Sequence, residues 1–130
     1  MKQVLALFLI CITLLGGCAN HQAKPDGAEQ LSRLINTLTE LTNMGEACGE
    51  HMNYFGKKAL QGAVCKEFKN AFYEHWPSRK ALQLEIIDHK RRQDLGLYSC
   101  SQCQQMLKQA EELRTFVTYY LDYMDFWNEL

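Results

Sequence analysis

Three features that would indicate common protein classes are missing from this 130-residue sequence. Its apolar run from Val4 to Leu15 has about 12 residues, whereas a permanent membrane-spanning helix needs roughly 20. Lys and Arg number 14 against 15 Asp and Glu, so no basic excess indicates nucleic-acid binding. No segment shows the sustained apolar–polar alternation of a half-buried β-strand.

Sequence motifs for catalysis and metal binding are also missing. The sequence has no G-x-S-x-G, no glycine-rich phosphate loop, and no H-x-x-x-H or H-E-x-x-H spacing. His51, His75 and His89 lie on different segments, so no pair of them suggests a set of metal ligands. We therefore predict a protein that is not an enzyme, with no catalytic residue, no metal site and no cofactor.

The N-terminal residues have the order of a secretory signal peptide. Lys2 gives a positive start, the apolar run follows, and two glycines lead to Cys18. Leu15-Gly16-Gly17-Cys18 resembles the lipobox of bacterial lipoproteins, an aliphatic residue and two small residues before a cysteine. The resemblance implies a signal peptide of residues 1–17, cleavage before Cys18, and acyl chains such as palmitate on its sulfur and amine. An ordinary signal peptide with an incidental cysteine is the alternative.

The residues after Cys18 indicate where the mature chain would lie. In lipoproteins an acidic residue at this position favours the inner membrane, and this chain has Ala19. We therefore expect the periplasmic face of the outer membrane, with the inner membrane or the cell surface as alternatives. Several acyl chains make such an anchor lasting. Residues 18–27 lack large apolar side chains and predict a flexible tether, followed by one domain over residues 28–130.

Four cysteines remain in that domain: Cys48, Cys65, Cys100 and Cys103. An even number in an oxidising compartment predicts two disulfides, although four cysteines allow three pairings. The predicted helix ends would place all four at one end of the bundle. That placement allows bonds from Cys48 and Cys65 to Cys100 and Cys103. We favour these bonds because a bond between Cys100 and Cys103 within a helix would strain the disulfide geometry. The alternative joins Cys48 to Cys65 and Cys100 to Cys103.

Apolar residues recur every three or four positions through most of the domain, as in amphipathic helices. Pro77 would end one helix at Trp76, Gly96 would cap the next, and Gly56 breaks an ambiguous segment over 50–61. The predicted helices cover residues 28–48, 63–76, 78–95 and 99–130. We therefore expect an all-α fold, a small disulfide-linked bundle of four principal helices.

The last predicted helix is rich in aromatic residues between Phe116 and Trp127. On a helical wheel, Tyr119, Tyr123 and Phe126 form a strip beside the predicted core seam. Aromatic residues are enriched at protein interfaces, so the strip predicts a partner-binding surface, with burial inside the bundle as the alternative. The remaining face would favour a basic partner through Asp122, Asp125 and Glu129.

Two shorter motifs each have more than one interpretation. Cys100-Ser101-Gln102-Cys103 is a C-x-x-C sequence at a predicted helix start, where a thiol pKa is lowered. Because no βαβ pattern surrounds it, we interpret it as structural, with redox activity or a zinc site as alternatives. The basic run His89-Lys90-Arg91-Arg92 is interpreted as an exposed helix face, with contact to anionic lipid headgroups as the alternative.

The anchor, the tether and the aromatic helix together predict a lipid-anchored periplasmic protein that binds another cell-envelope protein. An assembly or targeting role is expected, because the chain is similar in size and plan to the pilotins that carry secretin subunits to the outer membrane. The sequence has no pilotin motif beyond the lipobox, so no binding residue is carried over. An exclusion or immunity-type lipoprotein, or a thiol–disulfide protein using Cys100 and Cys103, are the alternatives.

The lipobox gives the first testable prediction. Replacement Cys18→Ser should abolish lipid attachment and membrane fractionation, because serine offers no thiol for the diacylglycerol thioether. Metabolic labelling with radioactive palmitate measures the outcome. Acyl chains on the Cys18→Ser protein would contradict the lipoprotein prediction.

Overall fold

The computed structural model describes residues 27–130. Its elements are α2 (Ala28–Phe55), the short 3-10 helix η1 (Gly56–Gln61), α3 (Ala63–His75), α4 (Arg79–Asp94) and α5 (Cys103–Glu129). The predicted signal peptide, Cys18 and nearly all of the predicted tether lie outside the described residues. Over residues 27–130 the regular structure is entirely helical, with four α-helices. The predicted all-α bundle of four principal helices is therefore confirmed.

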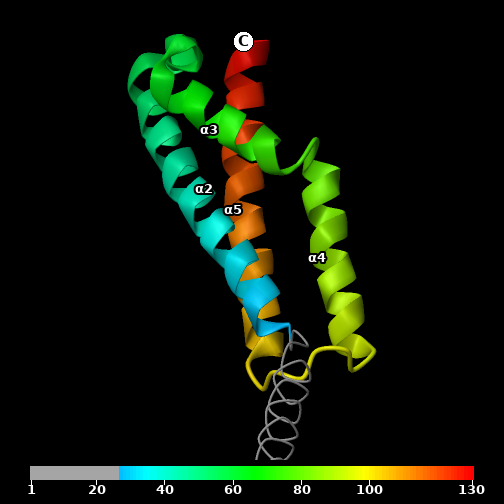
Figure 1. Cartoon of the computed structure of the whole chain (residues 1–130). Coiled ribbons are helices and arrows are strands. Elements are labelled where there is room, and N and C mark those ends of the chain that lie inside the picture. The colour runs from blue at the N-terminus through cyan, green and yellow to red at the C-terminus, as the bar shows by residue number, and fades with distance from the viewer. Residues whose placement is uncertain (1–26) are drawn as a thin grey trace, which may run out of the picture.

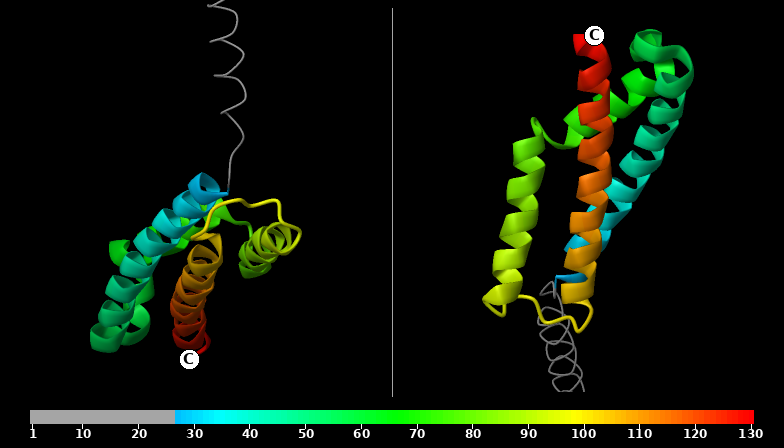
Figure 2. Two further views of the ribbon diagram at one scale, coloured as in Figure 1. Left: turned by 90° about the horizontal axis from the view of Figure 1, so that it is seen from below. Right: turned by 180° about the vertical axis from the view of Figure 1, so that it is seen from behind.

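The two long helices, α2 and α5, lie side by side and run in the same direction (Figure 1). They share the most extensive helix–helix contact of the described residues. The chain returns from the end of α2 to the start of α5 through α3 and then α4. Seen from below and from behind, α4 stands on the opposite side of α5 from α2 (Figure 2). The fold is therefore a parallel helix pair with a two-helix return limb.

Two glycines let α2 and α5 approach closely. A Cβ atom on Gly45 would lie 2.7 Å from Tyr120 Cδ2, and one on Gly49 would lie 3.2 Å from Tyr120 Cε1. Because the Gly45 distance is below any normal contact, the Tyr120 ring fills the space that a larger residue would occupy. Both glycines lie inside α2, although the sequence pattern placed the end of this helix near Cys48.

The other helix ends follow the predicted signals closely. Trp76 has extended backbone angles before Pro77 and closes α3, as the steric restriction before proline requires. Ser78 is the N-cap of α4, and its hydroxyl accepts a hydrogen bond of 3.1 Å from the Ala81 amide. Gly96 follows the end of α4 with a φ of 71°, the left-handed conformation that favours glycine at this point.

The apolar core has two parts. The larger cluster joins all four helices and η1, and its fully buried side chains include Leu38, Met52, Phe68, Phe72 and Leu82. The smaller cluster lies where α2 and α5 begin, and it consists of Leu31, Tyr98, Cys103 and Leu107. Tyr98 thus anchors the connection between α4 and α5 to the starts of both long helices.

The preferred disulfide pairing from the sequence was wrong. Cys48 is bonded to Cys65 and Cys100 to Cys103, with Cα–Cα distances of 4.7 and 5.3 Å, both in the usual range. The α3–α4 limb carries the chain back before α5 starts (Figure 1). The first bond therefore joins the last third of α2 to the start of α3, and the second lies far from it, at the start of α5. Cys100 precedes α5, and the second bond therefore does not have to form within helical geometry.

The two disulfides should differ in their contribution to stability. Replacement Cys65→Ser should lower the free energy of unfolding by about 2–4 kcal/mol, because this bond closes a separation of 17 residues and its sulfurs are buried. Replacement Cys100→Ser should cost less, because its bond spans only 3 residues. Urea unfolding of both variants measures the difference. A larger loss for Cys100→Ser would contradict this ranking.

Candidate functional site

Four aromatic residues form a row along the solvent side of α5, which we call the aromatic strip: Phe116, Tyr119, Tyr123 and Phe126. Tyr119 is 58% exposed, and Phe116 and Phe126 are each 53% exposed. Tyr123 is half-buried and packs against the larger core cluster. The three residues predicted from the sequence therefore lie on one face, and Phe116 extends that face by one turn. Two of the three predicted side chains are not buried by the bundle.

The rings of the strip are ordered relative to one another. Tyr119 and Tyr123 stack with ring centroids 6.2 Å apart and an interplanar angle of 18°. Tyr123 and Phe126 stack at 6.2 Å and 13°. The Tyr123 hydroxyl donates a hydrogen bond of 2.7 Å to Asn53 Oδ1 on α2. Contacts within the bundle thus hold the central ring, and its neighbours stack on it while exposed to solvent.

A shallow groove of about 350 Å³ lies beside the strip, between α2 and α5. Tyr119, Tyr120 and Tyr123 form its α5 side. Its α2 side carries the carboxylates of Glu46 and Glu50, both exposed. Burial, followed by the charge of Glu46 and then by Tyr119 and Glu50, raises the pKa of Tyr120 above its usual 10.0. The groove therefore combines three tyrosine rings with two acidic side chains.

Two of the three acidic residues that the sequence placed on the remaining face of the last helix form ion pairs within the molecule. Asp122 and Asp125 are both engaged by Arg79 at the start of α4, at 3.0 and 2.6 Å. These ion pairs hold α4 against α5. The acidic side chains at the aromatic groove are those of Glu46 and Glu50 on α2. Their spacing of four residues places them on one helix face, but the sequence did not show that this face lies beside α5.

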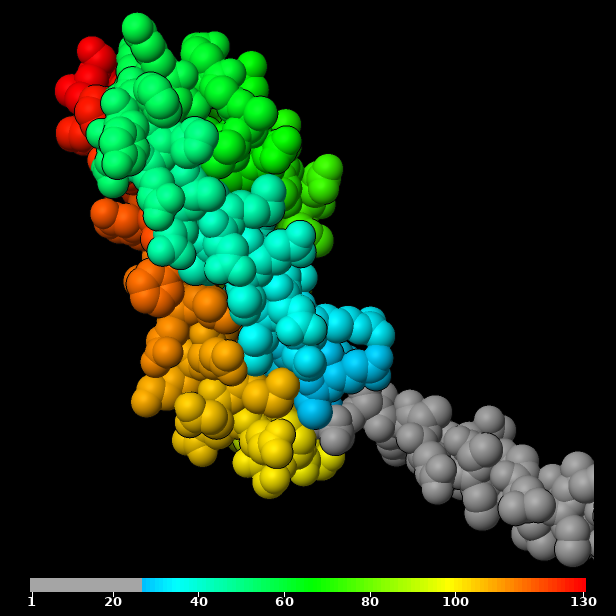
Figure 3. All heavy atoms as spheres, turned by 90° about the vertical axis from the view of Figure 1, so that its left-hand side faces the viewer, coloured from blue at the N-terminus to red at the C-terminus, as the bar shows by residue number. Residues whose placement is uncertain are grey.

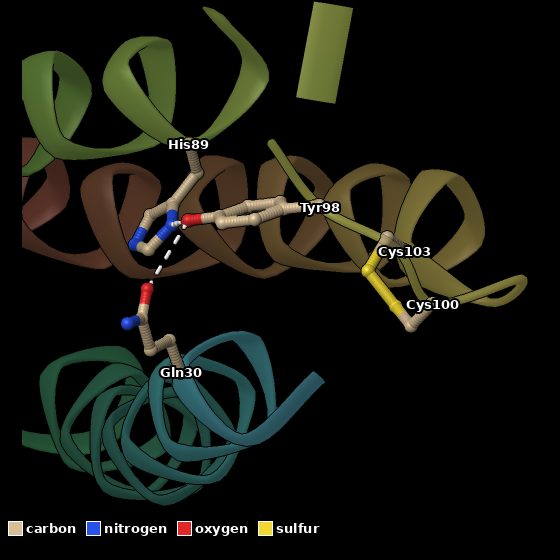
Figure 4. The surroundings of a disulfide bond; sticks show 5 residues. All are labelled: Gln30, His89, Tyr98, Cys100 and Cys103. Atoms are coloured by element: carbon tan, nitrogen blue, oxygen red, sulfur yellow. Dashed lines mark hydrogen bonds between the residues drawn. A yellow bond between two sulfur atoms is a disulfide. The ribbon is translucent and has the colours of Figure 1, made fainter. Parts of the chain in front are cut away.

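A second polar cluster joins three segments where α2 and α5 begin (Figure 4). His89 of α4 is buried, and its Nδ1 is hydrogen-bonded to the Tyr98 hydroxyl. That hydroxyl also donates a hydrogen bond of 3.3 Å to Gln30 Oε1 on α2. His89 therefore connects α4 to the loop that carries Tyr98. The sequence had suggested that His89 belongs to an exposed basic helix face, and for this residue that interpretation is wrong. Lys90, Arg91 and Arg92 are exposed.

A mixed polar cleft of about 440 Å³ lies between α2 and α4, next to this cluster. Trp76 forms part of its wall, and the Trp76 Nε1 donates a hydrogen bond of 2.7 Å to Glu85 Oε2. Its lining includes two basic side chains, Arg33 and Arg92, and two acidic ones, Glu85 and Asp88. The cleft therefore shows no preference for a ligand of one charge. This cleft was not predicted from the sequence, because its two walls are far apart in the chain.

The Cys100–Cys103 disulfide lies at the start of α5 (Figure 4). Cys103 is buried in the smaller core cluster, and Cys100 is partly buried.

Among residues 27–130, no group of three or more His, Cys, Asp or Glu side chains has the geometry of a metal site. Within the same range, no helix is both long and apolar enough to cross a membrane.

Comparisons with known proteins do not connect this fold to a described group. No protein-family model, curated protein or solved structure matches the chain. The function must therefore be argued from the site itself.

The buried His89 predicts a pH dependence of stability. Burial lowers its pKa below 6.5, with a further lowering by Arg92 that Glu85 and Asp88 oppose. Between the folded and unfolded pKa values, the unfolded chain binds more protons. This contribution to stability is therefore complete above about pH 6.5 and is lost as the pH falls through the lowered folded pKa.

The measurement is urea unfolding at several pH values for the wild type and for His89→Gln. We expect the wild-type free energy of unfolding to fall more steeply than that of the variant below pH 6.5. The carboxylates and the other histidines are common to both proteins, so the difference isolates His89. Parallel pH profiles would contradict the assignment.

Proposed function

We propose that this protein is a lipid-anchored periplasmic adaptor that binds another cell-envelope protein through the aromatic strip. It would act in assembly or targeting at the outer membrane, as pilotins do, without catalysing a reaction. The observation that carries the proposal is the row of stacked, half-exposed rings over Tyr119, Tyr123 and Phe126. A solvent-facing aromatic row of this kind is typical of an interface hot spot.

The groove beside the strip supports a specific kind of partner. Glu46 and Glu50 lie across from the rings of Tyr119 and Tyr123. A lysine or arginine of the partner would meet carboxylates on one side and aromatic faces on the other, an arrangement that favours cations. We therefore expect the partner to present a segment with apolar residues and at least one basic side chain.

A thiol–disulfide function remains the second candidate, and one observation favours it. Cys100 and Cys103 are bonded to each other in a C-x-x-C sequence, with the first sulfur in a connection and the second at a helix start. Free-thiol titration of protein recovered from its native compartment separates the candidates. Complete oxidation supports a structural role, whereas a pair of free thiols would favour redox chemistry.

An exclusion or immunity-type lipoprotein could use the same aromatic strip. The identity of the captured partner distinguishes this function from assembly or targeting.

The strip gives a prediction that separates binding from folding. Replacements Tyr119→Ala and Phe126→Ala should each weaken partner binding by about 1–2 kcal/mol or more. The free energy of unfolding should change by less than about 1 kcal/mol, because these rings are already largely in solvent. Affinity capture from detergent-solubilised envelopes, followed by a binding titration with the captured protein, measures the first effect. Urea unfolding measures the second.

Leu84 on α4 supplies the matched control, because it is as exposed as Phe126, at 53%. Replacement Leu84→Ala should leave both binding and stability unchanged. If the strip variants lose several kcal/mol of stability, the rings serve the core and the interface proposal fails. Equal binding by Leu84→Ala and Phe126→Ala proteins would also contradict it.

A further inference from the structure

One end of the bundle collects the elements nearest to the start of the described chain. The start of α2 lies there, together with the end of α4, the connection over residues 95–102 and the start of α5 (Figure 1). Figure 3 shows the start of α2 beside this connection and the start of α5. Gly27 is buried with a φ of 92°, and a Cβ at this position would lie 2.5 Å from the Tyr98 ring. The point at which the chain enters the domain is thus fixed against this connection. We call this region the Gly27 end.

Two leucines project from the Gly27 end without packing on the core. Leu95 is 68% exposed and Leu97 is 63% exposed. They flank Gly96 on the connection between α4 and α5. The next residue, Tyr98, is buried in the smaller core cluster and fixes the base of this connection. The two leucines therefore form a small apolar projection on an anchored loop.

Exposed basic side chains precede this projection on the last turns of α4. Residues 90–108 contain Lys90, Arg91, Arg92 and Lys108 but only one acidic residue, Asp94. Arg92 forms an ion pair with Asp88 at 3.0 Å, whereas Lys90 and Arg91 are exposed on the last turns of α4. The complete chain has a formal charge of −1. Glu29 at the start of α2 is paired with Arg33, so the exposed Lys90 and Arg91 supply positive charge at the Gly27 end.

We propose that the Gly27 end docks on the surface of an anionic phospholipid bilayer. Leu95 and Leu97 would enter the headgroup layer, and Lys90 and Arg91 would contact lipid phosphates. Exposed apolar side chains next to basic ones are the combination that binds such interfaces. This docking would fix the orientation of the bundle relative to the membrane.

This orientation of the bundle on the membrane rests on the proposed function, in which Cys18 carries the lipid anchor. Residues 18–27 can span at most about 30–35 Å, so an anchored chain keeps the Gly27 end close to the lipid. The far end of α2 lies about 40 Å away, from a rise of 1.5 Å per residue. In this orientation the aromatic strip runs away from the membrane along α5, toward a partner in the periplasm.

The far end of α2 offers a matched control, because it has a similar composition. Tyr54 and Phe55 are 87% and 62% exposed, and Lys57 and Lys58 follow them on η1. Their replacement removes as much exposed apolar surface and as much positive charge as changes at the Gly27 end. Non-specific adsorption to vesicles would be weakened by substitutions at either end. Docking by the Gly27 end would be weakened only by substitutions at that end.

The test measures vesicle binding by a chain of residues 19–130, which has no anchor but contains both disulfides and both core clusters. Vesicles are made of phosphatidylcholine alone or with an equal part of phosphatidylglycerol, and bound protein is measured by sedimentation. We expect binding to the anionic vesicles only, and weaker binding at high salt. Lys90→Gln with Arg91→Gln should reduce binding about fivefold per charge, and Leu95→Ser with Leu97→Ser on the order of tenfold.

The control pairs, Tyr54→Ser with Phe55→Ser and Lys57→Gln with Lys58→Gln, should bind as the wild type does. All variants should keep the wild-type unfolding midpoint, since the changed side chains are exposed. Equal binding to neutral vesicles, no binding to anionic vesicles, or an equal loss in the control pairs would overturn the proposal. The assay needs neither the lipid anchor nor a protein partner, so its failure is distinguishable from failure of the proposed function.

Discussion

The close contact between α2 and α5 is the constraint on which the rest of the structure depends. Tyr120 lies over Gly45 and Gly49, and a methyl group at Gly45 would overlap its ring. This contact places one face of α5 against α2, and it leaves the neighbouring face, with Tyr119 and Phe126, in solvent. Since Tyr120 is the residue of α5 that packs on the two glycines, the adjacent Tyr119 lies on a different face of the helix, where it remains exposed.

The return limb has a different role in the molecule. Arg79 binds two carboxylates of α5, and at its other end α4 is joined to α2 through His89, Tyr98 and Gln30. Between these two attachments α4 packs mainly on α5, which leaves the polar cleft beside α2. The limb therefore covers one side of α5 without covering the side that carries the strip.

The sequence predicted the helices well, because apolar spacing, Pro77 and Gly96 act locally. It also predicted the face shared by Tyr119, Tyr123 and Phe126, since residues three and four apart on a helix are neighbours. Features that depend on the order and direction in which the helices pack were not predicted correctly. The disulfide pairing, the burial of His89 and the position of Glu46 and Glu50 all follow from the return through two successive helices. The first predicted helix ended at residue 48, whereas α2 continues to Phe55, and Gly45 and Gly49 mark the place where α5 packs on it.

The order of the helices along the chain has a consequence for how the domain forms. The main partner of α2, the first described helix, is α5, the last one. Such contacts between distant segments slow the search for the native arrangement. The apolar face of α2 also stays without its principal cover until residues 103–129 have been synthesised. A chain that stops before α5 would therefore expose most of that face, so such a fragment should be prone to aggregation and proteolysis.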